Sequence, residues 1–387
     1  MSDYIHMNHG DDEKRNELME MLNQSFGFTN GDMEFSEMLP KLYKEEYKPA
    51  SNNIVLDVDG EMRAAVGLYY NTLTVCGEKL KIGGIGNVAV HPDYRSNGYM
   101  RYCMAYCLDE MKQNMTDFSF LCGARQRYEH FSYQQAGVRY RCSFQKGNVI
   151  RIYGKDKKSA FTAKPISKND TEILKQIAEI YNSRSFRAER PVEKMYDILL
   201  SWYSKPYAVF DGQEFKGWFA CNNEFKSISE IGYKNCADIA EIVICVLETS
   251  GQEAIDIDVP PFDTELTKYL ALHCEHYMLT HPDFYSIFCY ENVLRAFLKL
   301  KSTYQRLPDG ECVLLIEGEK LPEQLKITVK DNNITVEETT EKPDIALTHL
   351  EAMRLVGSHY SERRNELKPE CAAWFPIPLY TYSLDNV

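Results

Sequence analysis

The stretch that decides the fold is Val88-Ala89-Val90-His91-Pro92-Asp93-Tyr94-Arg95-Ser96-Asn97-Gly98-Tyr99-Met100. It predicts a β-strand that stops at Pro92, a tight turn, and then the start of a helix. Backbone N–H groups in such a turn point the same way, and together with the helix dipole they attract an anion. The stretch therefore predicts a binding site for phosphate.

The helix after the turn is indicated by apolar residues at three- and four-residue spacing, which buries one face. These residues are Met100, Cys103, Met104, Cys107, Leu108 and Met111. Gly98 lets a ligand approach the backbone closely, and Arg95 at the mouth of the turn is placed to pair with a phosphate. An ordinary strand–turn–helix with a solvated arginine has the same spacing, so the spacing alone leaves both interpretations open.

Two other phosphate motifs are excluded. The sequence has no Gly-x-x-x-x-Gly-Lys loop. The run Gly84-Ile85-Gly86-Asn87-Val88-Ala89 fits the dinucleotide pattern in letters, but it leads into a strand and then Pro92, where that pattern requires a helix. We interpret this run as the entry to the strand.

A second segment begins with the short apolar strand expected at residues 118–123. It continues into the spacing Tyr128-x-x-Phe131-x-Tyr133. Gly137 is expected to end a helix there, and residues 138–144 are expected to form the next strand.

Together these two segments resemble the Eis-type (enhanced intracellular survival) branch of the GNAT N-acetyltransferases. Arg95-x-x-Gly98-x-Met100 is similar to the acyl-coenzyme A pyrophosphate loop of that superfamily, and its bulky last residue is typical of the Eis-type branch. The run from Tyr128 to Tyr133 is similar to the branch's Tyr-x-x-Phe-Gly-Tyr segment, with Ser132 in place of the glycine.

The resemblance implies an enzyme that transfers an acetyl group from acetyl-CoA to a primary amine. It gives Tyr128 the role of general acid and the α-carboxylate of Val387 the role of general base, because the end of the chain enters the acetyltransferase site in that family. It also implies a homo-oligomer, a hexamer in the family. The residues expected to bind acetyl-CoA are Val88, Ala89, Val90, Arg95, Ser96, Asn97, Gly98, Tyr99 and Met100.

The chemistry needs these parts. The amine must be neutral when it attacks the thioester, the oxyanion must be held, and the departing thiolate must be protonated. A tyrosine (pKa about 10) can give a proton to a thiolate (about 8.5), and backbone N–H groups around Val88 and Val90 can polarise the carbonyl. A packing role for Tyr128 stays open, since the chain has 26 tyrosines.

Length and pattern predict an α+β protein of several domains, since 387 residues exceed one ordinary core. We expect an α/β GNAT domain with mixed sheets at residues 1–150 and a degenerate second GNAT-like domain, without the Arg-x-x-Gly loop, at 151–287. One cofactor per chain follows from that missing loop. Residues 288–387 resemble the sterol-carrier-protein-like third domain of Eis-type proteins.

The formal net charge of −13 argues against a general nucleic-acid binder and fits a cationic acceptor such as an aminoglycoside, a polyamine or a lysine side chain. Residues 91–141 carry seven Arg or Lys against five Asp or Glu, a positive island suited to an anionic cofactor. Three aromatic residues near the N-terminus, Phe26, Phe28 and Phe35, could line a substrate cleft or pack in the core.

The twelve cysteines form no zinc-type Cys-x-x-Cys pair and fit buried thiols in a reducing compartment. His273 and His276 could share a helical face, but nothing completes a metal site, so we expect none. A signal peptide and an apolar run of about 20 residues are missing, so we expect a cytoplasmic protein that does not enter the membrane.

The sequence leaves some choices open. It does not name the acceptor amine, and it does not separate acetyl from longer acyl donors. A non-catalytic sensor of acyl-CoA and a lipid-binding protein that uses the C-terminal domain remain the alternatives to the enzyme.

Overall fold

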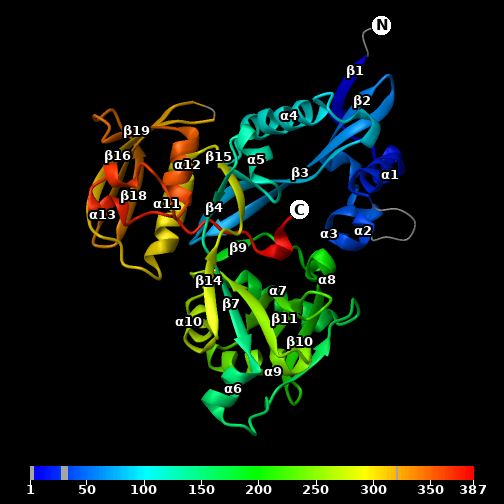
Figure 1. Ribbon diagram of the computed structural model, residues 1–387, viewed down its shortest axis with the longest axis vertical. Helices are drawn as coiled ribbons and strands as arrows, with labels where there is room; N and C mark the ends of the chain where they lie inside the picture. The colour runs from blue at the N-terminus through cyan, green and yellow to red at the C-terminus, as the bar shows by residue number, and fades with distance from the viewer. Residues whose placement is uncertain (1–3, 28–33, 320) are drawn as a thin grey trace.

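A computed structural model describes residues 4–27, 34–319 and 321–387, so Phe28 lies outside the described part. Three β-sheets, each covered by helices, surround the end of the chain (Figure 1). The C-terminus lies near the middle of the molecule, between the first and second sheets, while the N-terminus projects from one end (Figure 1).

The first sheet contains the strand that ends at Val90, and the short strand β9 (Phe186–Ala188) pairs with β3 outside the main strand order. Along the sheet the order is β1 (Ile5–His9), β2 (Asn53–Val58), β3 (Glu61–Val75), β4 (Glu78–Val90), β5 (Phe118–Leu121), β15 (Asp283–Ile287) and β6 (Gln134–Ala136). The helix α4 (Tyr99–Gln113) packs on one face, against Ile54 and Leu68 among others. The helices α1 (Arg15–Phe26), α2 (Phe35–Met38) and α3 (Pro40–Tyr43) pack on the other face, with Val55 and Tyr69.

The second sheet lies below the first in Figure 1. Its order is β14 (His276–Thr280), β7 (Arg139–Gln145), β13 (Ala254–Val259), β12 (Ser227–Tyr233), β11 (Glu214–Cys221), β10 (Lys205–Asp211) and β8 (Thr162–Pro165). The helices of this part are α6 (Lys146–Tyr153), α7 (Thr171–Asn182), α8 (Met195–Leu200), α9 (Ile239–Ser250) and α10 (Thr264–His273). Its own apolar core forms mainly between α9 and the sheet.

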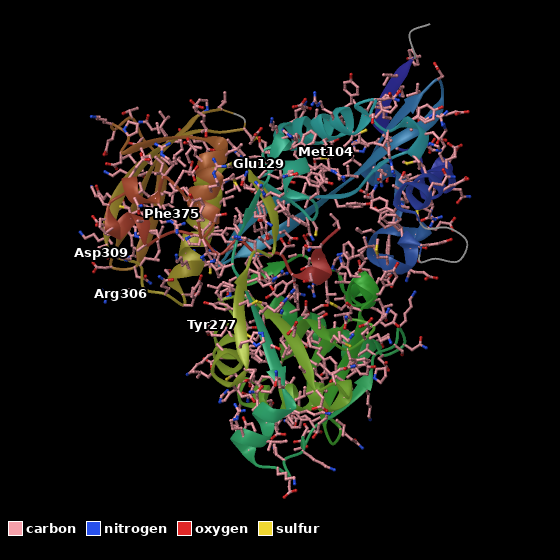
Figure 2. All side chains as sticks on the ribbon, in the orientation of Figure 1. Met104, Glu129, Tyr277, Arg306, Asp309 and Phe375 are labelled. Atoms are coloured by element: carbon pink, nitrogen blue, oxygen red, sulfur yellow. The ribbon has the colours of Figure 1, made fainter. Side chains whose placement is uncertain are left out.

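The third sheet is formed by β18 (Asn333–Glu338), β17 (Glu323–Lys330), β16 (Gly310–Glu317) and β19 (Ile345–Thr348). It packs with α11 (Tyr290–Ser302), α12 (His349–Gly357) and the short α13 (Pro369–Ala372). The helix α12 begins with a capping box, in which Thr348 and Glu351 cap each other. The third part contacts the first through an ion pair between Arg354 and Glu129, a residue labelled in Figure 2.

The first and second sheets have corresponding strands in the same order over four positions, and each sheet contains one strand from the other half of the chain. One sheet contains β4-β5-β15-β6, and the other contains β12-β13-β7-β14. In both, the first two strands are parallel and are connected by a long helix, α4 or α9. The strands inserted in third place, β15 and β7, come from the other half of the chain; we call them the exchanged strands. As a result β7 pairs in the second sheet although its residues precede position 150.

The structure confirms the strand that ends before Pro92, the strand expected at residues 118–123, observed at Phe118–Leu121, and the helix that follows Gly98. The expectation that Gly137 ends a helix is wrong, because Gly137 follows the strand β6 and turns the chain there with φ 86°. The idea that His273 and His276 share a helical face is also wrong, since one ends α10 and the other begins β14. None of the helices in the described residues is long and apolar enough to span a bilayer.

Residues 373–387, which we call the tail, are mostly buried. The Nζ atom of Lys301 donates to the carbonyl oxygens of Trp374 and Pro376, each at 3.0 Å. Nearer the end, Lys41 donates to the carbonyl oxygen of Leu384, so two buried lysines hold the tail along its length.

A charged cluster fixes the end of the tail. The guanidinium of Arg190, which lies in the segment after β9, pairs with Asp385 and Glu230, both at 2.7 Å. The side chain of Arg190 is fully buried, and Tyr181 also donates to Asp385 at 3.2 Å. Because a buried charge must keep its partners, this cluster ties the tail to the second sheet.

Replacing Asp385 tests this anchor. Asp385→Ala leaves part of the charge of Arg190 uncompensated, and we expect it to lower the free energy of unfolding by about 3 kcal/mol. Urea denaturation measures this loss. Asp156→Ala, at an exposed site in the polar linker, is the control and should leave the midpoint unchanged. Equal midpoints for the two variants would contradict the anchor.

Candidate functional site

The site begins where β4 and β5 separate. These two parallel strands pair only over Ile82–Ile85 and Phe118–Leu121, and β4 then continues to Val90 without its neighbour. A β-bulge lies just past the last paired residues. Ala65 of β3 faces Ala89, whereas Gly67 faces Gly86, so β4 has one extra residue there. A bulge at such a point leaves backbone groups unpaired and directed into the gap.

Asn87 at the bulge has a φ of 35°, a conformation that needs support from its surroundings. Its side-chain oxygen accepts a hydrogen bond from the hydroxyl of Tyr43, and its amide donates to Asn53 at 2.6 Å. Asn53 in turn donates to the hydroxyl of Tyr69 at 3.4 Å. This buried network fixes the bulge from the face covered by α1–α3, and no sequence pattern pointed to it.

The decisive loop lines a cavity of about 890 Å³, which we call the loop cavity. Eight of the nine predicted cofactor-binding residues line it, namely Val88, Ala89, Val90, Arg95, Ser96, Gly98, Tyr99 and Met100. Asn97 does not line it. Gly98 has φ 80° at the start of α4, which explains why glycine stands at the first helical turn. The N-terminus of this fifteen-residue helix therefore faces the loop cavity.

Three arginines surround the loop cavity: Arg95, Arg101 and Arg127. None of them forms an ion pair with an acidic side chain of the described residues. Arg95 donates to the carbonyl oxygen of Ser25 at 2.9 Å, which holds it beside the loop. Uncompensated arginines beside a helix N-terminus favour a ligand that carries phosphate groups.

Tyr128 lies at the end of α5 (Arg125–Tyr128), with its ring beside Gly123, just past the end of β5. Its side chain is 5% exposed, and burial raises the pKa of its phenol while neighbouring Arg127 opposes that shift. Gly123 packs directly on its ring, because a Cβ at Gly123 would lie 2.4 Å from Cε2 of Tyr128. Tyr128 does not itself line the loop cavity, but its neighbours Arg127 and Phe131 do.

Val387 reaches the same strand from the opposite side of the sheet from α4. A Cβ built on Gly86 would lie 2.9 Å from the carboxyl carbon of Val387, and one on Gly84 would lie 2.6 Å from its Cγ2. Only glycine allows this approach. The structure thus brings the terminal carboxylate to the residue just before the bulge.

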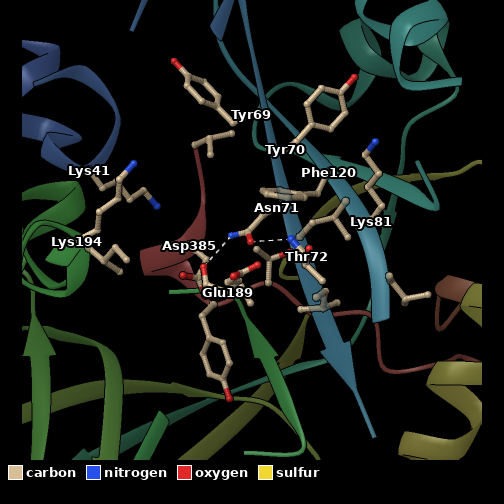
Figure 3. A pocket seen from close by; sticks show the side chains of 18 of the residues that line it. Lys41, Tyr69, Tyr70, Asn71, Thr72, Lys81, Phe120, Glu189, Lys194 and Asp385 are labelled. Carbon is tan, nitrogen blue, oxygen red and sulfur yellow. Dashed lines mark hydrogen bonds between the residues drawn. The ribbon is translucent and has the colours of Figure 1, made fainter. Parts of the chain in front are cut away.

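Val387 also lines a second cavity, of about 700 Å³, which we call the tail cavity. Figure 3 shows this cavity from close by, with Tyr69, Phe120 and Asp385 among its walls. Lys41 and Lys194 enter it from one side, and Lys81 lies on the other (Figure 3). The loop cavity reaches β4 at residues 88–90, past the bulge, whereas the tail cavity reaches β4 at residues 79–82 and is linked to the bulge through Val387.

Most of the charged residues that line the tail cavity are lysines, and many of the other lining residues are aromatic. Its acidic members are Glu189 and Asp385 besides the terminal carboxylate, and Asp385 is already paired with Arg190. Burial lowers the pKa of Lys41 to about 7, although nearby Asp385 opposes the shift. The residues that line this cavity thus give a cationic acceptor only a small acidic surface.

Of the aromatic residues for which a cleft and the core were both open, Phe26 lines the loop cavity, whereas Phe35 is buried in the core with α1 and α3. In the described residues no group of three or more His, Cys, Asp or Glu side chains is placed to hold a metal ion.

Comparison with known proteins agrees with this geometry. Residues 7–136 match the family model described as an acetyltransferase (GNAT) domain. The chain carries the domain of an acetyl-CoA-dependent acyltransferase. No curated protein matches the sequence.

Solved structures share the fold over nearly the whole chain. A GCN5-related N-acetyltransferase from Anabaena variabilis is 15% identical, with 99% of this chain and 100% of that chain covered and a TM-score of 0.67. A GCN5-related N-acetyltransferase from Kribbella flavida is 16% identical, with 90% and 87% covered and a TM-score of 0.64. Eis1 from Mycobacterium abscessus is 14% identical, with 90% and 87% covered and a TM-score of 0.58. Likeness at this identity shows that the folds agree.

Enlarging Gly86 tests the approach of the tail. Gly86→Ala places a methyl group against the carboxyl carbon of Val387, so we expect kcat for acetyl transfer to fall at least about tenfold, with acetyl-CoA affinity retained. Gly147→Ala is the matched control, because a Cβ there meets no atom within 4 Å. Steady-state kinetics and calorimetric titration measure the two quantities. Equal kcat values for both variants would show that the terminal carboxylate does not act at this place.

Proposed function

We propose that this protein is an N-acetyltransferase that moves an acetyl group from acetyl-CoA directly to a primary amine, with Tyr128 as general acid and the α-carboxylate of Val387 as general base. The observation that carries the proposal is the contact of the terminal carboxyl group with Gly86, beside the gap between β4 and β5.

The loop cavity supports a donor site. The helix N-terminus at Tyr99 and the side chains of Arg95 and Arg101 suit the pyrophosphate of coenzyme A. The gap between β4 and β5 would then accept the pantetheine arm and its thioester. Backbone N–H groups of β4 around Val88 and Val90, freed from pairing with β5, would hold the carbonyl oxygen as charge develops on it.

The proton steps follow from the two ends of the site. The terminal carboxylate takes a proton from the attacking amine, which gives the amine its lone pair. The amine then attacks the thioester carbonyl and the C–N bond forms, which gives a tetrahedral intermediate. The intermediate collapses, the C–S bond breaks, and the phenol of Tyr128 protonates the leaving thiolate. The remaining extra proton on the nitrogen leaves through solvent and restores the phenol. Burial raises the pKa of Tyr128, so the phenol keeps its proton at neutral pH and can donate it.

The acceptor would enter through the tail cavity, since Val387 lines that cavity. We propose that the acceptor must have a primary amine but need not carry several positive charges, because lysines outnumber unpaired acidic side chains among the residues that line this cavity. Glu189, which takes part in no ion pair within the described residues, is the acid available for a second ammonium group.

The domain assignment is also a proposal. The shared strand order of the first two sheets supports a second GNAT-like unit without a loop of its own, and hence one acetyl-CoA per chain. We propose that residues 288–387 form the sterol-carrier-protein-like unit that the sequence resembles. Its role at the site is to deliver the tail, which leaves the third sheet after α13 and ends at Gly86.

The phenol of Tyr128 can be tested by removing its oxygen. We expect Tyr128→Phe to lower kcat by about a hundredfold or more, because the thiolate would leave unprotonated, while acetyl-CoA still binds. Thiol release from acetyl-CoA in the presence of aminoglycosides, polyamines and lysine peptides measures the rate. Tyr277→Phe, at an exposed tyrosine of β14 labelled in Figure 2, is the control. An unchanged rate in Tyr128→Phe would show that the phenol is not the acid, and an absence of thiol release with every amine would favour a sensor of acyl-CoA over an enzyme.

The carboxylate of Val387 can be tested by moving it. One glycine added after Val387 keeps the fold but displaces the carboxylate from Gly86, so we expect turnover to fall about a hundredfold or more. Val387→Ala keeps the carboxylate in place and should retain most of the activity. If the extended chain turned over at the rate of the unmodified protein, the assignment of the base would be wrong.

A further inference from the structure

Asp283 is the first residue of the exchanged strand β15 and stands beside the gap between β4 and β5. Across the sheet, Ile85, Leu121 and Phe284 face one another in a single row of β4, β5 and β15. The next row toward the gap therefore has Gly86 at one end and Asp283 at the other. Paired strands lie about 4.8 Å apart and β4 separates from β5 in this row, so these two residues are at least about 10 Å apart across β5.

The side chain of Asp283 lies on the face of the sheet where the tail ends. Tyr285, two residues along β15, faces Phe120 of β5, and alternate residues of a strand share a face. Phe120 in turn packs at Gly84 next to Val387. Asp283 and the terminal carboxyl group are thus on one face and in one row.

A hydrogen bond links Asp283 directly to the tail. The amide of Asn386 donates to Oδ1 of Asp283 at 3.2 Å, and Asn386 is joined by a peptide bond to Val387. The other oxygen of Asp283, Oδ2, is buried and has no hydrogen-bond partner within the described residues, and the same holds for Oδ1 of Asn386. A carboxyl group that is 5% exposed and half-satisfied is costly for packing alone.

The groups around Asp283 leave it without a dedicated cation. Arg139 is the nearest, but its guanidinium already pairs with Asp258 at 3.5 Å and donates to the hydroxyl of Thr280 at 3.1 Å. Cys122 at the end of β5 and Tyr285 also face Asp283, and burial raises the pKa of both. They stay neutral at neutral pH and give Asp283 no charge partner.

We propose that Asp283 is a positioning residue, which as a neutral carboxyl group holds Asn386 and thereby keeps the terminal carboxylate of Val387 at Gly86. This proposal rests on the proposed function, in which that carboxylate is the general base. If Asp283 loses its proton, a second anion appears on the same face without its own cation, and it repels the terminal carboxylate from its place. Burial raises the pKa of Asp283 to about 8, although Arg139 and Asn386 oppose the shift, so the change falls in a range that kinetics can reach.

The test compares Asp283→Asn with the unmodified chain over pH. Asparagine keeps the oxygen that accepts from Asn386 but cannot ionise. The ratio of kcat/KM, variant over unmodified, cancels the ionisation of the acceptor amine and of Tyr128, which both proteins share. We expect this ratio to be constant below pH 7 and to rise about tenfold by one unit above the pKa of Asp283. Asp256→Asn, on half-buried β13, is the matched control and should give a flat ratio.

Thermal unfolding gives a readout that does not need activity. The pKa of Asp283 is near 4 in the unfolded chain and about 8 in the folded one, so the unfolded state loses its proton first as the pH rises. The unmodified protein therefore loses stability across that window, whereas Asp283→Asn does not. We expect the Tm of the variant to gain on that of the unmodified protein as pH rises from 5 to 8.

Each outcome decides one point. A flat ratio with a flat Tm difference would overturn the proposal, because Asp283 would then be ionised throughout. A rate that falls equally at every pH, with a lower Tm, would leave Asp283 a packing residue and overturn it as well. If the Tm difference grows with pH as expected but no amine supports thiol release, the proposed function has failed and not the neutral state of Asp283.

Discussion

The structure of the site depends on one buried charge cluster, formed by Arg190, Glu230 and Asp385. Arg190 donates to both oxygens of Glu230 and to both oxygens of Asp385, and Trp218 donates to Glu230 at 3.0 Å. Three charges buried together are stable only while all partners are present. The cluster therefore fixes Asp385, and with it the last two residues of the chain, in a place that only the complete fold can create.

The two sides of the site are assembled differently. The loop cavity is built from the first part of the chain alone, namely the end of α1, the end of β4, the loop, the start of α4 and residues 127–131. The tail cavity is built from β3, β4, the segment after β9 and the tail, which meet only when the three sheets are in place. The proposed donor site thus depends on the first part of the chain, and the placement of the proposed base depends on the whole fold. The exchanged strand β15 joins the two sides, because it pairs with β5 and carries Asp283.

This difference explains what the sequence could predict. The strand, turn and helix around Gly98 follow from local periodicity and a glycine in a left-handed turn, and all three were predicted within a few residues. The terminal carboxylate was placed through resemblance, and no property of Val387 itself pointed to it. The helical end expected at Gly137 was wrong because β6 and the exchange of β7 override local turn signals. Arg190 reads as a surface charge in sequence, since its partners lie 40 and 195 residues away.

The measurement that tests the central claim most directly is a crystal structure of the protein with coenzyme A bound. The account predicts the pyrophosphate at the N-terminus of α4, the thiol in the gap between β4 and β5, and the carboxylate of Val387 still against Gly86 on the tail side of the same strand. A tail displaced from Gly86 by the bound cofactor, or a thiol on a different edge of the sheet, would contradict the claim that the end of the chain completes the site.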